Sequence, residues 1–186
     1  PRFALVDTLF SLPEMCLYAD LVERLESRDK KVDYWKLLDD TRECIDEAHR
    51  DNTLKSIVVA DFPTFIDRDP MLPRTLHKLR SSGKQLFLLT NSHWSYTDRV
   101  MGYLLSGSMQ EYPEWQNFFD VLLVGANKPR FFTGQDPIAE IDHDGKILRR
   151  PITRFERGHI YEAGNRRDFE KALRISGENI LYVGDH

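Results

Sequence analysis

Cysteine is scarce in this chain, and long apolar runs are lacking. The two cysteines, Cys16 and Cys44, are far apart and do not have the spacing of a metal site, so a reducing, cytoplasmic setting is expected. No apolar stretch approaches the roughly 20 residues that a membrane-spanning helix needs. Basic charge is not in excess either, because the formal net charge is -4. The negative net charge argues against general binding to nucleic acid or to acidic membranes, because both need a basic surface.

What the chain does contain is enough apolar sequence for a folded domain. Its 186 residues, of which 41% are hydrophobic and 30% charged, suffice for one domain with a core, or for one domain with a modest cap. From about residue 70 onward, predicted helices alternate with short apolar runs, which is typical of a parallel, doubly wound sheet. We therefore predict an α/β fold, with a helical cap or substrate-binding region at 1–65 and a Rossmann-like core at 66–186.

Hydrophobic periodicity and turn signals predict the individual elements. Helices are expected over residues 14–26, 33–50, 53–62, 70–82, 94–105 and 166–175. Short buried strands are expected over 85–90, 119–124 and 179–183, and a β-hairpin over 138–148, around the turn Asp142-His143-Asp144-Gly145. Asp69 is expected to cap the helix at 70–82, with Pro70 at its first position.

Polar residues suited to phosphate chemistry follow each of the three predicted strands. The first strand ends in Thr90-Asn91-Ser92, the second opens into a loop with Lys128, and the third is followed by Asp185. The carboxyl ends of parallel strands meet at one edge of a sheet. There the hydroxyls, the amide and the lysine could hold phosphate oxygens, while the carboxylate holds Mg²⁺. Taken singly, these residues are also typical of a helix cap, a surface lysine and a turn.

A polar stripe is predicted along the helix at 33–50. Arg42, Asp46 and His49 stand at i, i+4 and i+7, which places them on one side of the helix, and Lys55 follows after a turn signal. The cationic side chains could donate to the oxygens of a purine nucleotide, and Asp46 could accept from its ring nitrogens. The alternative is a solvated face with an ordinary i,i+4 ion pair.

Longer strings around these residues carry a family resemblance. The strings are DTLFSLPE at 7–14, TNSHWSYTD at 90–98, KPRFF at 128–132 and ILYVGDH at 180–186. They resemble the cytosolic purine 5′-nucleotidases, which prefer IMP and GMP, within the haloacid dehalogenase (HAD) superfamily. The resemblance implies a Mg²⁺-dependent hydrolase that forms an aspartyl-phosphate and passes the phosphoryl group to water or to a nucleoside. Proteins of this kind often form homotetramers, so a homo-oligomer is a further expectation.

Carried over by position, the resemblance assigns three groups of residues. Thr90, Asn91, Ser92 and Lys128 would bind the phosphate, Asp185 would ligate Mg²⁺, and Phe10, Arg42, Asp46, His49 and Lys55 would contact the base and ribose. Phe10 would supply an aromatic face for the purine. Arg50 stands where relatives often carry an aromatic residue, so no role is carried over to it.

The Asp-x-Asp motif that the resemblance implies for the nucleophile is not found. Asp7 follows an apolar run but lacks the second aspartate, while Asp67-Arg68-Asp69 and Asp142-His143-Asp144 follow no predicted buried strand. The motif at 180–186 also lacks the second acidic residue that the resemblance implies, so we expect this sequence to be part of a longer enzyme. Two alternatives stay open: a catalytically silent nucleotide-binding or regulatory protein of the same fold, and a phosphatase for another small phosphate ester.

Overall fold

The computed structural model describes residue 6 and residues 8–28 and 30–184, apart from the side chain of Phe10. These residues form two units, one within Pro1–Ile57 and Leu181–His186 and the other Val58–Ile180. None of the helices in these ranges combines the length and the hydropathy that a membrane-spanning helix needs.

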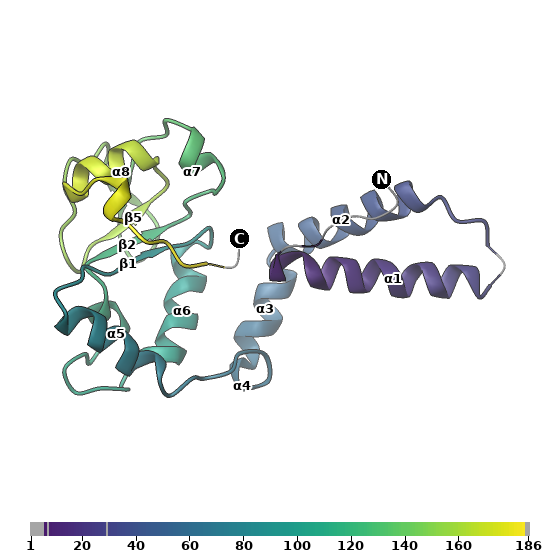
Figure 1. The fold of residues 1–186 in the computed structure, drawn as a ribbon, viewed down its shortest axis with the longest axis horizontal. Helices are drawn as coiled ribbons and strands as arrows, with labels where there is room; N and C mark the ends of the chain where they lie inside the picture. Colours follow the sequence, from purple (N-terminus) through teal and green to yellow (C-terminus); the bar gives the residue numbers. More distant parts are fainter. Residues whose placement is uncertain (1–5, 7, 29, 185–186) are drawn as a thin grey trace. The chain divides into compact units, whose positions relative to one another are not determined.

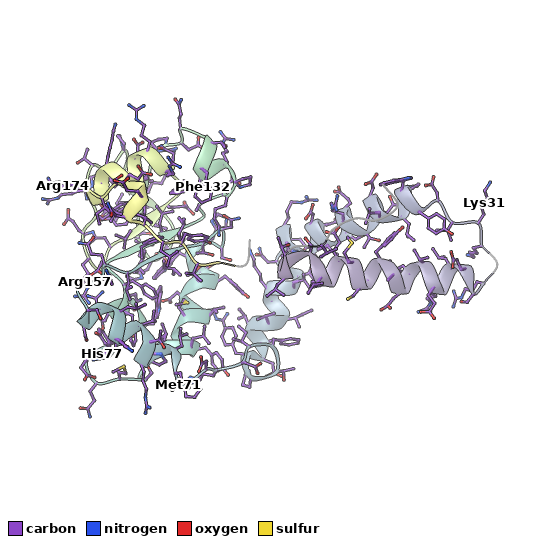
Figure 2. The ribbon with its side chains drawn as sticks, in the orientation of Figure 1. Lys31, Met71, His77, Phe132, Arg157 and Arg174 are labelled. Atoms are coloured by element: carbon purple, nitrogen blue, oxygen red, sulfur yellow. The ribbon has the colours of Figure 1, made fainter. Side chains whose placement is uncertain are left out.

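A helical hairpin makes up most of the first unit. A short 3-10 helix, η1 (Leu9–Ser11), leads into α1 (Leu12–Glu26), which has a proline in its first turn, where no helical N–H bond is lost. The next helix, α2 (Tyr34–Arg50), runs beside α1, and the connection between them carries Lys31 (Figures 1 and 2). It begins after Asp33, whose carboxylate accepts from the backbone N–H of Lys36 at 3.1 Å. The helices predicted at 14–26 and 33–50 are confirmed.

The hairpin buries only a narrow seam between its two helices. Leu21 on α1 and Leu37 and Ile45 on α2 are half-buried, and among the described residues of both helices Thr41 alone is fully buried. The Thr41 hydroxyl donates to the carbonyl of Leu37 at 2.7 Å, which satisfies it inside the seam. The outer side of α2 is therefore open to solvent.

A mixed sheet forms the centre of the second unit. Its order in the described residues is β1 (Phe87–Leu89), β2 (Val121–Val124), β5 (Ile160–Glu162), β3 (Ala139–Ile141) and β4 (Ile147–Arg149). The pairings β1–β2 and β2–β5 are parallel, whereas β3 is antiparallel to both β5 and β4. The predicted α/β class is confirmed, as is the hairpin around residues 142–145. The sheet is mixed rather than wholly parallel as predicted, because β3 runs against its two neighbours.

Helices cover both faces of this sheet. Figure 1 shows α5 (Leu72–Ser81) and α6 (Trp94–Leu105) on one side of the strands, and α7 (Arg130–Thr133) and α8 (Arg166–Leu173) on the other. All four residues of β2 are at most 2% exposed. This explains why β2 is an unbroken apolar run, since a strand covered on both faces has no reason to alternate.

Aromatic side chains fill the two layers between helices and sheet. On the α6 side, Trp94 packs with residues of β2 and with the 3-10 helix η2 (Trp115–Phe118) in one core cluster. On the other side, the ring of Phe169 from α8 lies 5.2 Å from that of Phe87 and 5.8 Å from that of Phe131. These layers fix the positions of the helices that follow the strand ends.

One predicted strand does not form, and one strand that was not predicted pairs with β2. Residues 179–183 contain the end of the 3-10 helix η3 (Gly177–Asn179) and an extended segment in which Leu181 and Val183 are each 82% exposed. No strand of the described residues pairs with this run, and its side chains are exposed, so the prediction of a third buried strand there is wrong. Strand β5, although short, pairs with β2 on one side and β3 on the other. Pairing thus outweighs local hydrophobicity.

Two helix boundaries also differ from prediction. The helix α5 begins at Leu72 rather than at Pro70, and the Asp69 carboxylate accepts from the backbone N–H of Met71 at 2.8 Å in the preceding turn. The helix predicted at 53–62 is divided into α3 (Thr53–Ala60) and α4 (Phe62–Phe65). The division falls at Asp61, whose φ of -149° and ψ of 71° are not helical.

Candidate functional site

The segments that follow β1 and β2 are joined at the carboxyl edge of the sheet. The N–H of Thr90 donates to the carbonyl of Leu123 at 3.1 Å, and the N–H of Ala126 donates to the carbonyl of Thr90 at 2.9 Å. The N–H of Gly125, the residue before Ala126, donates to the carbonyl of Ser92 at 2.9 Å. The polar residues after β1 therefore lie directly beside the loop that carries Lys128.

A side-chain clamp fixes that loop. The Asn91 amide oxygen accepts from the backbone N–H of Lys128 at 2.6 Å, and its NH₂ group donates to the Lys128 carbonyl at 3.3 Å. The Lys128–Pro129 peptide bond is cis. Two of the three predicted strand tips thus meet. The amide retains a second N–H and a second lone pair, so the phosphate contact predicted for Asn91 stays a prediction.

The hydroxyl of Thr90 shapes the turn after β1. It accepts from the backbone N–H of Ser92 at 3.1 Å, while its own hydrogen can still serve an acceptor such as a phosphate oxygen. The plainer interpretation, that Thr90-Asn91-Ser92 caps the next helix, is wrong, because the N-cap of α6 is His93 and makes no side-chain cap bond. The three residues belong to the strand edge.

A His–Glu pair at the same edge was not predicted. The Nδ1 atom of His93 lies 2.9 Å from Oε1 of Glu162, the last residue of β5. A carboxylate therefore does lie at this edge, although it is not the predicted Asp185. The only sequence signal was the pair Ile160-Tyr161 before Ala163-Gly164, which is too short to identify a strand by periodicity.

Gly125 has both a backbone and a packing reason to be glycine. Its φ is +54°, and an added Cβ would lie 3.0 Å from Cγ of Glu162 and 3.2 Å from Nδ1 of His93. We expect Gly125→Ala to lower the free energy of unfolding by about 2–4 kcal/mol, through backbone strain and overpacking together. Chemical denaturation measures this loss.

Gly107→Ala is the matched control for that substitution. Gly107 has a similar φ of +67°, but an added Cβ would meet nothing within 4 Å. Its loss should be confined to the backbone effect, about 1 kcal/mol. Equal losses for the two variants would contradict the packing of the His93–Glu162 pair against Gly125.

The predicted polar stripe on α2 is exposed on one side of the helix. Arg42, Asp46 and His49 are all exposed, and the imidazole Nδ1 of His49 lies 2.8 Å from the carbonyl of Ile45. Lys55 lies in α3 and is half-buried. Phe10, the proposed aromatic contact, has a side chain outside the described residues. The structure thus places three of the predicted base contacts on one face.

Arg42 makes its ion pair across the hairpin rather than along its own helix. Its Nη2 and Nε atoms donate to Oε1 of Glu14 on α1 at 2.7 and 3.1 Å. The hydrogen bond to Glu14 is the main cause of a raised pKa for the Arg42 guanidinium, followed by the charge of Glu14. The i,i+4 pair of the plainer interpretation is therefore not the contact that Arg42 makes.

Neither described Asp-x-Asp string follows one of the parallel strands that form the edge. Asp142-His143-Asp144 does follow a buried strand, β3, contrary to expectation, but β3 is antiparallel to β5, so its end lies at the opposite edge. The Asp142 carboxylate is also occupied by the backbone N–H groups of Asp144 and Lys146. Asp67-Arg68-Asp69 follows the helix α4, and Asp7 lies outside the described residues.

A complete metal cage is not present in the described part of the chain. Within it, no group of three or more His, Cys, Asp or Glu side chains could hold a metal ion. Mg²⁺ is commonly held by one or two carboxylates together with water and substrate phosphate, so such a cage is not required. Asp185, the predicted ligand, lies outside the described residues, and the magnesium site stays a prediction.

Comparisons with known proteins identify the family. A family model described as the 5′ nucleotidase family matches residues 1–186. The chain is 35% identical over 179 residues to 5′-nucleotidase domain-containing protein 2 of Homo sapiens and to that of Rattus norvegicus, covering 96% of this chain and 33% and 31% of those proteins. It is 30% identical over 180 residues to a 5′-nucleotidase domain-containing protein of Dictyostelium discoideum, covering 96% of this chain and 30% of that protein. The chain thus spans about a third of the length of these curated relatives. Because the family model matches it from end to end, the chain belongs to the 5′ nucleotidase family.

Proposed function

We propose that the protein hydrolyses the 5′-phosphate of purine nucleoside monophosphates, with the phosphate bound at the carboxyl edge of β1 and β2. The observation that carries the proposal is the clamp of the Asn91 amide on the backbone of Lys128. The clamp fixes the backbone of Lys128 beside the segment that follows β1, which supports a preorganised cation at this edge. Preorganised charge of this kind is the largest single contribution to many enzymatic rate accelerations.

The roles of the edge residues follow from their chemistry. Lys128 would neutralise phosphate oxygens and the charge that develops during transfer, and Thr90 and Ser92 would donate hydroxyl hydrogen bonds. Asp185 would hold Mg²⁺, which supplies further neutralisation of the phosphate when bound.

The reaction pattern that we propose is that of the haloacid dehalogenase superfamily. An aspartate attacks phosphorus and the 5′-oxygen of the nucleoside leaves. Water, or a second nucleoside, then takes the phosphoryl group from the aspartate. Cytoplasmic location and a homo-oligomeric state belong to the same proposal.

The exposed stripe on α2 supports a preference for 6-oxopurines. A 6-oxopurine presents an oxygen acceptor beside a ring N–H donor, and Arg42 and Asp46 supply the complementary donor and acceptor. Adenine presents an amino donor beside a ring nitrogen acceptor, which reverses the pattern. His49 and Lys55 would donate to ribose or base oxygens, and Phe10 would stack on the purine.

The test is phosphate release by the full-length protein from IMP, GMP, AMP and CMP, with and without Mg²⁺. We expect release that depends on Mg²⁺ and a kcat/KM at least about 10-fold higher for IMP and GMP, because one mismatched polar contact is worth roughly 1–3 kcal/mol. Equal release from all four would retire the purine assignment. Binding of IMP without phosphate release would favour the silent nucleotide-binding alternative.

A further inference from the structure

The ion pair between Glu14 and Arg42 joins the two helices of the hairpin. Glu14 lies in the first turn of α1 and Arg42 near the middle of α2, 28 residues further on. Both Nε and Nη2 of Arg42 donate to the same carboxylate oxygen, at 3.1 and 2.7 Å. The Glu14 side chain is 17% exposed, whereas the Arg42 side chain is 54% exposed. The carboxylate is thus partly enclosed while the guanidinium reaches solvent.

Other ion pairs on the same helix differ from this one. Arg50 pairs with Glu43, and Lys36 with Asp40, within α2 itself, and the side chains of all four are more than half exposed. Solvated pairs of that kind restrict their side chains little and contribute little. The Glu14–Arg42 pair instead ties a long side chain to a different helix, so the hairpin packing determines its direction.

The pair leaves part of the guanidinium available for a ligand. A guanidinium carries five N–H donors in a rigid, planar fork, of which two N–H groups point at Glu14. The remaining donors keep a fixed plane as long as the pair is intact. Without Glu14, a ligand would have to order a side chain whose rotamer freedom is worth about 1.5–2 kcal/mol.

We propose that Glu14 is a positioning residue for base recognition, which holds the Arg42 fork in the orientation that donates to the 6-oxygen of the purine. This inference rests on the proposed function and adds to it a residue that determines base specificity. Asp39 and Asp46, both on α2, are the other carboxylates that act on the charge of Arg42. Among the described residues, Glu14 differs from these two aspartates because its carboxylate accepts hydrogen bonds from the Arg42 guanidinium.

The experiment compares E14Q, E14D and R42A in the full-length protein, with E43Q as the matched control. For IMP, we expect E14Q to raise KM about 5–20-fold, as loss of one charged hydrogen bond predicts, with kcat within about twofold. The preference for IMP over AMP should fall by the same factor. E14D, which keeps the charge on a shorter side chain, should recover part of that loss, and E43Q should change neither constant.

The outcomes separate this inference from the proposed function. If R42A raises KM for IMP while E14Q leaves it unchanged, the positioning role is overturned and the purine site stands. If R42A has no effect either, the proposed purine site fails. If E14Q lowers kcat for IMP and AMP alike together with the unfolding temperature, Glu14 is a structural residue only, and the inference is overturned.

Discussion

Lys128→Ala is expected to reduce phosphate release from IMP by about 10²–10³-fold in kcat/KM, because loss of one preorganised electrostatic group typically has that effect. The lysine follows β2 at the carboxyl edge, and its backbone is held by both ends of the Asn91 amide. The positive charge of Lys128 should stabilise the negative charge that builds up on the phosphate during transfer. Phosphate release under saturating and limiting IMP would separate the effects on kcat and KM.

A second lysine provides the control for charge alone. Lys171 is an exposed residue in the last turn of α8, and Lys171→Ala removes the same formal charge. It should leave kcat/KM within about twofold, because the charge of an exposed lysine that does not contact the substrate is screened by water and salt. Equal effects of the two substitutions, or no effect of Lys128→Ala, would contradict the assignment of Lys128 to the phosphate.

Asn91→Ala is expected to lower kcat by about 10–10²-fold, because a small misplacement of a catalytic group can reduce the rate by that much. The substitution removes both hydrogen bonds to the Lys128 backbone but leaves the lysine side chain in the protein. Asn91→Asp should be a sharper test, since the carboxylate can still accept from the Lys128 N–H but cannot donate to its carbonyl. It also places negative charge beside the phosphate, so KM should rise as well.

The free energy of unfolding of the Asn91 variants should be measured beside their kinetics, so that a loss of stability is not mistaken for a loss of catalysis. Two lost hydrogen bonds should lower the free energy of unfolding by about 1–3 kcal/mol, a loss that a folded protein can survive. Asn91→Ala with wild-type kcat and unchanged stability would mean that the clamp has no role in placing Lys128.

The sequence predicted correctly those elements whose hydrophobic or turn pattern matches the burial and pairing that they have in the fold. The apolar run before Asn127 forms β2 because both faces of that strand are covered, and the Asp142–Gly145 turn forms the predicted hairpin. Strand β5 gave no such signal, since only two apolar residues precede Glu162. Its position depends on pairing with distant strands, which periodicity cannot detect.

The same division holds for the candidate site. The meeting of Asn91 with Lys128 was predictable, because parallel strands place their carboxyl ends at one edge. The contact of His93 with Glu162 was not, since it depends on β5. Glu14 was also missed, because its partner Arg42 lies on another helix, and spacing along one helix cannot identify a contact between two.

The central claim is that the strand edge holds a phosphate together with its metal. The most direct test is a crystal structure of the full-length protein with Mg²⁺ and with inosine and inorganic phosphate, which are the products of IMP hydrolysis. We expect the phosphate oxygens within about 3 Å of Lys128 Nζ and the Thr90 hydroxyl, and Asp185 among the ligands of the Mg²⁺ ion. A phosphate bound elsewhere, with Lys128 directed away from it and Asp185 remote from the metal, would contradict the account.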